Sequence, residues 1–454
     1  MTLDPFKFDK QGVLEIYNQK LTTATNAIKV ISPDVKFVTF GCYAATPPTL
    51  MRTFLEIVKT DYFKNPVRIY VFRSADNLVN LFNDIELLKR LRITTPFIGK
   101  PMRDVLNTAY ENKKGVFLPD FVATHFSEIG KSFLNQHGKP DVHMLQVSPM
   151  DEHGYFSFGI DGSFSIDSAR IAEKVIVEVN SNFPRTFGDG ILHVSQVDAI
   201  IENTSNLLKS KEREISEESK IIGKIIAEQI PDKACIQLGV GDVPDAVGLF
   251  LEAKNDLGIH TELLTSSQVK LILNGNVTNK YKNLNKYHTV FNVAMLPSQI
   301  YYNVLDNNPS MLCYPGSYVN NPSVISKIDQ MISINSFVEI DLYGQVASES
   351  IHWQEITATG GQVDFIRGAK NSNGGKSFLA AHSTTKNGTV SKIVPRLNNF
   401  VSTLRTDVHH VVTEYGCVDL SGLSSKGRAR ALISIAHPNH RESLEQAAKE
   451  LNLM

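Results

Sequence analysis

Short runs rich in β-branched and aromatic residues alternate with helix-like segments along most of this chain, and this alternation constrains its fold more than any other feature. In the first half, strands are predicted at 36–41, 67–72, 141–147 and 175–180. A helix after Pro47-Pro48 and an amphipathic stretch at 78–91 lie between them. Because strands separated by helices form sheets that the helices cover, the sequence predicts an open α/β layer with a largely parallel sheet.

The alternation lapses between residues 201 and 219, where the most charged segment of the chain lies. We place a domain boundary there, although a solvated surface helix inside one domain is an alternative. Beyond it, helices are predicted at 221–230, 243–253, 267–273 and 323–329, and strands at 234–238, 259–264, 289–293 and 331–342. We therefore expect two similar open α/β domains with largely parallel sheets, residues 1–208 and 209–454, with the active site in the cleft between them.

The charge balance limits the kind of partner. There are 46 Lys and Arg residues against 47 Asp and Glu residues, a net charge of −1, and 42% of the chain is hydrophobic. This composition is ordinary for a soluble globular protein and creates no overall basic field for nucleic acid. We expect a small-molecule partner, with neither nucleic acid nor a membrane involved.

The cysteines and the N-terminus indicate a compartment. Cys42, Cys235, Cys313 and Cys417 are scattered singly, without the short paired spacings of zinc sites or disulfide frameworks. Residues 1–10 contain acids and a proline where a signal peptide needs an apolar stretch, and no run approaches the length of a membrane span. The sequence therefore predicts a cytoplasmic protein.

A glycine-containing loop joins a predicted strand to a predicted helix at Gln237–Val247. Gly239, Val240 and Gly241 would present unpaired N–H groups and a helix N-terminus to an anion or a developing oxyanion. Because Pro244 occupies the place of a third glycine, the loop is not the dinucleotide fingerprint. A turn that uses glycine only for its geometry is the alternative.

Glu262 lies on an otherwise apolar predicted strand, two residues after His260, so both side chains are expected on one face of the sheet. A carboxylate in that position is either a surface residue or a functional one, because its unpaired burial is costly. A carboxylate can attack a thioester to form an anhydride and is regenerated at the end. With the glycine loop, Glu262 points to coenzyme A transfer without a metal or a redox cofactor.

A second glycine turn lies within residues 358–369. Gly360 and Gly361 leave backbone amides open, and Gln362 and Asp364 add polar groups, so a phosphate or a thioester could rest there. A glycine turn entering a strand is the alternative. The nearby sequence Asn373-Gly-Gly-Lys-Ser is not a phosphate-binding P-loop, because the position five before Gly375 is Lys370.

Two histidine-containing segments resemble metal ligands only superficially. Asp151-Glu-His-Gly is expected to be a polar turn, because adjacent residues on a turn or strand do not converge on one ion. His409, His410 and His437 are expected to be structural or surface residues. We predict no metal site.

Together these segments resemble the family of acetyl-CoA hydrolases and 4-hydroxybutyrate-type CoA-transferases, related to the α/β-domain family I CoA-transferases. The resemblance extends nearly end to end. Its motifs lie at 147–155, 182–189, 239–244, 258–262, 338–346, 360–365 and 412–416.

The resemblance implies a role for several residues. Glu262 corresponds to the nucleophile, and the backbone around Gly239, Val240 and Gly241 and around Gly360, Gly361 and Gln362 to the part that binds CoA. Residues 41–47 and 125–128 resemble segments near the carboxylate pocket. The family often has Ser-Asp-Gly after the glutamate, whereas this chain has Thr265-Ser-Ser-Gln, a loss of one carboxylate that bears on acyl specificity.

The predicted function is therefore transfer of CoA between an acyl-CoA and a small carboxylate, by a ping-pong route through a glutamyl anhydride and a glutamyl-CoA thioester. Coenzyme A is then a substrate, and no cofactor is needed. An acyl-CoA hydrolase and a non-catalytic CoA-binding protein are the alternatives. Acetate, butyrate, 4-hydroxybutyrate, succinate and itaconate all remain candidate acids, and the resemblance favours a homodimer or higher homo-oligomer.

Overall fold

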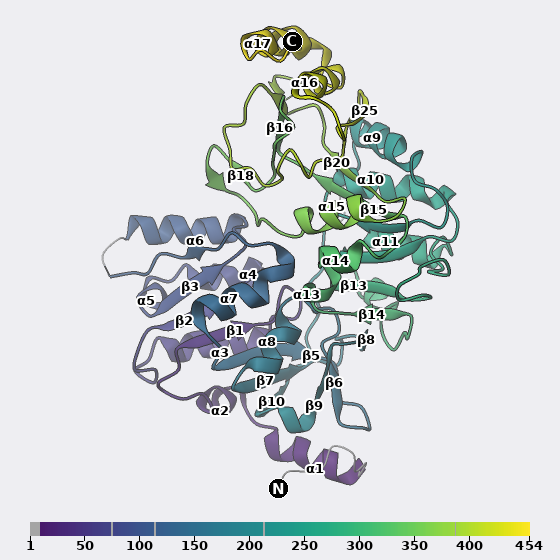
Figure 1. Cartoon of the computed structure of the whole chain (residues 1–454). Helices are drawn as coiled ribbons and strands as arrows, with labels where there is room; N and C mark the ends of the chain where they lie inside the picture. The colour runs from purple at the N-terminus through teal and green to yellow at the C-terminus, as the bar shows by residue number, and fades with distance from the viewer. Residues whose placement is uncertain (1–9, 74–75, 113–114, 212–213, 386) are drawn as a thin grey trace. The chain divides into compact units, whose positions relative to one another are not determined.

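The computed structural model describes residues 10–73, 76–112, 115–211, 214–385 and 387–454 (Figure 1). Its contacts separate two compact units. Unit 1 contains the described parts of 1–124, 128–210 and 292–317, and unit 2 contains those of 125–127, 211–291 and 318–454. Two segments therefore depart from a simple division into halves: residues 125–127 belong to unit 2, and residues 292–317 belong to unit 1. The domain boundary at 208/209 remains a prediction.

Unit 1 is built on a parallel sheet in the order β10-β7-β5-β1-β2-β3-β4. Every neighbouring pair in this order runs parallel. The strands are β1 (Phe37–Phe40), β2 (Val67–Tyr70), β3 (Leu91–Thr95), β4 (Asp120–Phe121), β5 (Val142–Val147), β7 (Lys174–Val179) and β10 (Ala199–Glu202). The α/β layer predicted for the first half of the chain is confirmed.

Helices of unit 1 bury one apolar side each against this sheet. In α3 the buried positions Leu50, Met51, Phe54, Leu55 and Val58 recur at helical spacing. The longer helices of the unit are α1 (Lys10–Lys20), α2 (Ala24–Lys29), α3 (Pro48–Val58), α6 (Lys100–Glu111), α7 (Ile129–His137) and α8 (Ser165–Ile171). Shorter elements are β6 (Tyr155–Ser157), β8 (Phe187–Gly188), β9 (Ile191–His193), α12 (Gln299–Asn303) and β14 (Met311–Cys313).

The single amphipathic stretch expected at 78–91 was wrong. The structure has three short elements there, α4 (Asp76–Val79), the 3-10 turn η1 (Asn80–Phe82) and α5 (Ile85–Leu88). The Asp84 side chain accepts a hydrogen bond from the backbone N–H of Glu86 and so starts a new helix. This cap breaks the helix that the apolar spacing alone suggested.

Unit 2 contains a sheet in the order β25-β24-β20-β15-β11-β12-β13. From β24 to β12 each neighbouring pair is parallel, and β25 runs antiparallel to β24. The strands are β11 (Cys235–Leu238), β12 (Gly258–Leu264), β13 (Thr289–Ala294), β15 (Met331–Ser336), β20 (Lys376–Ala380), β24 (His410–Thr413) and β25 (Gly416–Asp419). The carboxyl ends of five parallel strands therefore share one edge of this sheet.

Four helices of unit 2 were predicted, and they begin within four residues of the expected start: α9 (Glu217–Ala227), α10 (Asp242–Phe250), α11 (Ser266–Leu273) and α14 (Pro322–Ile325). Three further helices were not predicted: α15 (Gln362–Asn371), α16 (Ser425–Ser434) and α17 (Pro438–Glu450). No helix in the described ranges is long and apolar enough to cross a membrane. Small additional strands are β16 (Glu339–Asp341), β17 (Val346–Ala347), β18 (Ser350–Ile351), β19 (Gln354–Glu355), β21 (Thr384–Thr385), β22 (Val390–Ser391) and β23 (Ile393–Val394).

The long strand predicted at 331–342 is also wrong. Strand β15 ends at Ser336, opposite the last residue of its neighbour β20, Ala380. The chain then enters a separate small sheet, in which β16 pairs with β17 and β23. Because apolar residues lie on both sides of this break, the sequence pattern predicted β15 and β16 as a single strand.

Candidate active site

The predicted site residues lie at the carboxyl edge of the sheet in unit 2. Gly239, Val240 and Gly241 follow β11 directly, and Glu262 is near the end of β12. These strands are parallel, with Ile236 opposite Ile259, so the loop after β11 and the end of β12 lie at the same edge of the sheet. Small-molecule sites in open α/β sheets occur at this edge.

The turn at Gly360 and Gly361 contacts Glu262. A Cβ atom added to Gly361 would overlap both Oε2 of Glu262 and Nδ2 of Asn320. Only glycine therefore fits at this position with the two side chains in place. The structure thus brings the nucleophile candidate and one of the two predicted glycine segments into direct contact.

Asn320 is the partner of the Glu262 carboxylate. Its Nδ2 atom donates a hydrogen bond of 2.5 Å to Oε2 of Glu262. The Asn320 side chain is fully buried, and its Oδ1 atom has no hydrogen-bond partner in the described part of the chain. The amide is therefore held in one place with its N–H groups directed at the carboxylate.

Burial sets the charge state of Glu262. The pKa of the Glu262 carboxyl group is raised to about 7, mainly because protein atoms surround it; the Asn320 hydrogen bond opposes this rise and the charge of Asp364 adds to it. The residue as a whole is partly exposed. The carboxyl group is therefore poorly solvated, and its pKa lies close to neutral pH.

Asp364 connects this site to the segment around residue 126. Its two carboxylate oxygens accept hydrogen bonds from the backbone N–H of Ser127 at 3.1 Å and from the Ser127 hydroxyl at 2.8 Å. The N–H of Phe126 donates to the carbonyl of Gly360 at 3.0 Å. Residues 125–127, which the resemblance associates with a carboxylate pocket, therefore belong to unit 2 and contact the second glycine turn.

His260 and Glu262 point to the same side of β12, as predicted. His260 Nε2 lies 2.8 Å from the carbonyl of Val319, the residue before Asn320. The pKa of His260 is lowered to about 3, mainly by burial and also by the charge of Lys282, so the ring is neutral at neutral pH. The two residues therefore do not form a charged pair.

The first glycine loop is held at its start and open at its tip. The N–H of Gly239 donates to the carbonyl of Ile334 at 2.9 Å. Val240 is 47% exposed, and Gly241 has a φ of 144°, a backbone conformation that favours glycine. Helix α10 begins at the next residue, so the loop presents a helix N-terminus at the sheet edge.

The second glycine turn enters helix α15, so the alternative of a turn entering a strand was wrong. Gly360 has a φ of 63° and nothing within 4 Å of an added Cβ, which leaves open space beside it. Gln362, the first residue of α15, donates from Nε2 to the Thr403 hydroxyl at 3.0 Å. The side chain of Gln362 is therefore directed at Thr403 and not at Glu262.

The segment around 151 forms the expected polar turn. Asp151 Oδ1 accepts hydrogen bonds from the N–H groups of His153 at 2.9 Å and Tyr155 at 2.8 Å. Its other oxygen lies 3.2 Å from the guanidinium of Arg185. Asp151 thus shapes the turn before β6.

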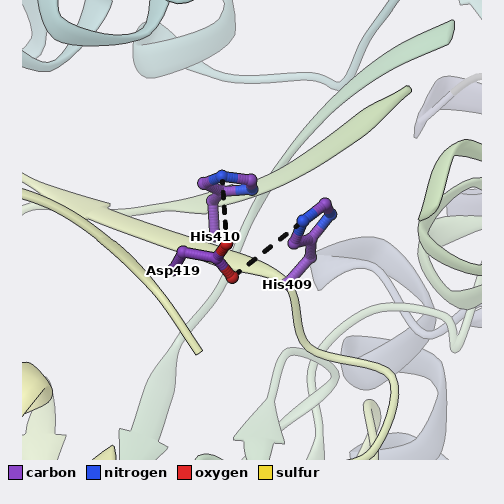
Figure 2. Close-up of side chains that lie close together, drawn as sticks. All are labelled: His409, His410 and Asp419. Carbon is purple, nitrogen blue, oxygen red and sulfur yellow. Dashed lines mark ion pairs between the residues drawn. The ribbon is translucent and has the colours of Figure 1, made fainter. Parts of the chain in front are cut away.

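His409, His410 and Asp419 lie together on the β24–β25 hairpin (Figure 2). The Nε2 atom of each histidine is 4.0 Å from a carboxylate oxygen of Asp419. The N–H of Ser377 approaches Nδ1 of His409 at 3.4 Å, which places the proton of the neutral ring on Nε2. The 4.0 Å separations from Asp419 are longer than hydrogen bonds, and the Nδ1 lone pair of His409 already accepts from the N–H of Ser377.

Family models of the acetyl-CoA hydrolase/transferase N-terminal and C-terminal domains match residues 6–208 and 298–448. A 4-hydroxybutyrate coenzyme A transferase of Clostridium kluyveri is 39% identical over 96% of this chain and 99% of its own length. A butyryl-CoA:acetate CoA-transferase of Anaerostipes caccae is 39% identical over 73% of this chain and 77% of its own.

Solved structures agree with these sequence matches. The crystal structure of RipA from Yersinia pestis superposes with a TM-score of 0.92 at 39% identity, covering 97% of this chain and 100% of that one. Proteins named acetyl-CoA hydrolase are more distant, with 24% identity over 76% of this chain and 72% of the protein from Yarrowia lipolytica.

Proposed function

Because this chain belongs to the acetyl-CoA hydrolase/transferase family, we propose that it moves coenzyme A between an acyl-CoA and a small carboxylate with Glu262 as the nucleophile. The observation that carries the proposal is the contact of the Glu262 carboxylate with Asn320 and Gly361 at the carboxyl edge of a parallel sheet. A buried carboxylate with a single amide partner is poorly solvated and therefore reactive toward a thioester.

The first half-reaction exchanges the acyl group for CoA. A Glu262 oxygen attacks the thioester carbonyl, and the carbon–sulfur bond breaks. The CoA thiolate departs, and the acyl group stays bound to Glu262 as an acyl-glutamyl anhydride. The thiolate then attacks the glutamyl carbonyl of the anhydride. The carbon–oxygen bond breaks, the acyl group leaves as a free carboxylate, and Glu262 holds CoA as a thioester.

The second half-reaction reverses these steps with the acceptor acid. The acceptor carboxylate attacks the glutamyl-CoA thioester and gives a new anhydride with release of the thiolate. The thiolate attacks the acceptor carbonyl of this anhydride, which forms the new acyl-CoA and regenerates the Glu262 carboxylate. The first acid leaves before the second one reacts, and CoA stays on Glu262 in between, so the kinetics are ping-pong.

Each attack creates an oxyanion beside amides that are fixed before the reaction. The donors available are the Asn320 side-chain amide and the backbone N–H group of Gly361. One such donor typically contributes about 3 kcal/mol to transition-state stabilisation. No metal and no cofactor are needed for these steps.

Replacement of Glu262 by alanine tests the proposal. Loss of the nucleophile is expected to lower kcat for CoA transfer by at least about a thousandfold, while the thermal midpoint shows a folded protein. A variant that keeps most of the transfer activity would show that Glu262 is not the nucleophile.

An acyl-CoA hydrolase is the second candidate, since water can accept the acyl group from the same anhydride. The higher identity to proteins named CoA-transferases than to those named hydrolases favours transfer. CoA release from acetyl-CoA with and without added carboxylates separates the two reactions. A transferase is nearly idle without an acceptor acid, whereas a hydrolase is not.

We propose a small acyl group and do not assign a single one. Acetyl-, butyryl-, 4-hydroxybutyryl- and succinyl-CoA are the candidate donors, and a panel of the corresponding acids, with itaconate, identifies the acceptor. We also propose a cytoplasmic homodimer or higher homo-oligomer. Light scattering of the purified protein measures the oligomeric state.

A further inference from the structure

Three hydrogen-bonded polar side chains, His382, Ser219 and Asp242, adjoin the loop formed by Gly239, Val240 and Gly241. We call these three side chains the relay. His382 Nε2 is 2.7 Å from the hydroxyl oxygen of Ser219, and this hydroxyl lies 2.9 Å from Oδ2 of Asp242. Asp242 is the first residue of helix α10 and follows Gly241 directly. None of these contacts involves Glu262 or Asn320.

The direction of each hydrogen bond follows from what the groups can donate. An ionised carboxylate only accepts, so the Ser219 hydroxyl donates to Asp242. The Ser219 oxygen must then accept from Nε2–H of His382, and it also accepts from the Ser216 hydroxyl at 3.1 Å. The one donor and two acceptor positions of the buried Ser219 hydroxyl are thereby all used.

This relay connects three elements of the same unit. His382 lies two residues after β20, Ser219 belongs to α9, and Asp242 starts α10 after β11. Strands β20 and β11 are separated by β15, so at about 4.8 Å per strand the relay joins points roughly 10 Å apart along the sheet edge. It therefore holds the far end of the glycine loop against neighbouring parts of the sheet.

Both oxygens of Asp242 are engaged. Oδ1 accepts from the N–H of Val243 at 3.0 Å, while Oδ2 accepts from Ser219. With Gly239 fixed to Ile334 on the other side, the loop is anchored at both ends. The anchors determine where the N–H groups of the loop point.

The charges around Asp242 are balanced. Asp242 is negatively charged and lies beside a loop that is proposed to hold an anionic ligand, so positive charge nearby is needed to offset it. Lys392 lies close enough to Asp242 and Glu414 that both oppose the lowering of its pKa by burial. His382 is partly exposed and its Nε2 atom lies 3.6 Å from Oδ2 of Asp242, while Lys392 places a positive charge near the two acids.

We infer that His382 is a positioning residue for CoA binding, because through Ser219 it fixes Asp242 and the loop of Gly239, Val240 and Gly241. The inference rests on the proposed function only in taking this loop as part of the CoA site. Since the loop holds the CoA part of the substrate and Glu262 performs the chemistry, the relay affects binding of CoA more than the chemical step.

Four variants test this positioning role. His382→Ala is expected to raise KM for acyl-CoA and Kd for CoA about tenfold, with kcat at saturation within about twofold of the wild type. His382→Gln places an N–H donor near the position of Nε2 and is expected to restore most of the affinity. Ser219→Ala breaks the same relay, so the double variant with His382→Ala is expected to bind CoA no more weakly than the poorer single variant.

Ser424→Ala is the matched control. Ser424 caps another helix of the same unit, α16, by accepting a hydrogen bond from the N–H of Gly427, and this helix does not belong to the relay. This variant is expected to lower the thermal midpoint and leave Kd for CoA unchanged, as measured by titration calorimetry with CoA alone. Circular dichroism of each variant confirms that it is folded.

The outcomes separate this inference from the proposed function. Wild-type affinity for CoA in His382→Ala, or a folded His382→Gln variant as weak as His382→Ala, would overturn the positioning role. Either result leaves the chemistry of Glu262 intact. If Glu262→Ala keeps its activity while His382→Ala still weakens CoA binding, the nucleophile assignment fails and the positioning role stands.

Discussion

The side-chain amide of Asn320 donates a hydrogen bond of 2.5 Å to Oε2 of Glu262, and it is the partner that stabilises the ionised carboxylate. In the proposed mechanism Oε2 becomes an oxyanion when the thiolate attacks the glutamyl carbonyl, and the Asn320 amide would then donate to it. The proposed mechanism therefore gives Asn320 two roles, control of the charge of Glu262 and stabilisation of the transition state.

Asn320→Ala is predicted to lower kcat by about a hundredfold to a thousandfold, because it removes one donor to the oxyanion. It also removes the interaction that lowers the pKa of Glu262, so the acidic limb of the pH–rate profile is expected to move to higher pH. Steady-state rates between pH 5 and 9 measure both effects. An unchanged limb would show that Asn320 does not contact the ionised carboxylate.

Gly361→Ala is predicted to abolish most of the transfer activity, because its Cβ would displace Glu262 and Asn320. Gly360→Ala is the matched control, since an added Cβ at Gly360 meets open space. The control is strained by its positive φ and is expected to lose about 1 kcal/mol of unfolding free energy. Similar kcat values for the two variants would contradict the close contact at Gly361.

Ionisation of Glu262 predicts the pH dependence of activity. The attacking species is the carboxylate, so kcat/KM is expected to rise with pH and level off above a pKa of about 7. Asp364→Asn removes a charge that raises this pKa, and the limb is expected to move to lower pH. A limb that stays in place in Asp364→Asn would show that another group controls it.

The contribution of Glu262 to the free energy of unfolding is predicted to fall with rising pH, whereas kcat/KM is predicted to rise. The folded-state pKa of Glu262 is raised above its unfolded value, so the native state binds more protons between about pH 4.5 and 7. The contribution of Glu262 to unfolding free energy therefore falls as pH rises through this window. Glu262→Gln removes the buried charge, and its thermal midpoint relative to wild type is expected to be higher at pH 8 than at pH 5.

The sequence predicted the elements that carry strong local signals. The βα alternation located β1, β2, β5, β7 and β11 to β13, because buried parallel strands are short apolar runs that glycines and helices separate. It failed where a side-chain cap or a change of sheet broke an apolar run, at Asp84 and after Ser336. Such breaks depend on tertiary neighbours that periodicity does not record.

The site was predicted in part. Glu262 and Gly361 were singled out, and the structure places them in contact. Asn320 was missed, because the surrounding Asn-Asn-Pro resembles an ordinary helix start, and Asn321 does cap α14 by accepting from the N–H of Ser323. The contact of Asn320 with Glu262 spans 58 residues, so no local pattern indicates it.

The most direct test of the central claim is to trap the covalent intermediate. The protein is incubated with acetyl-CoA, reduced with borohydride, digested, and its peptides are analysed by mass spectrometry. Reduction of a glutamyl-CoA thioester converts that carboxyl group to a primary alcohol, and the account predicts this change at Glu262 only, dependent on acetyl-CoA. An unmodified Glu262 in an active preparation, or the same change at another carboxylate, would contradict it.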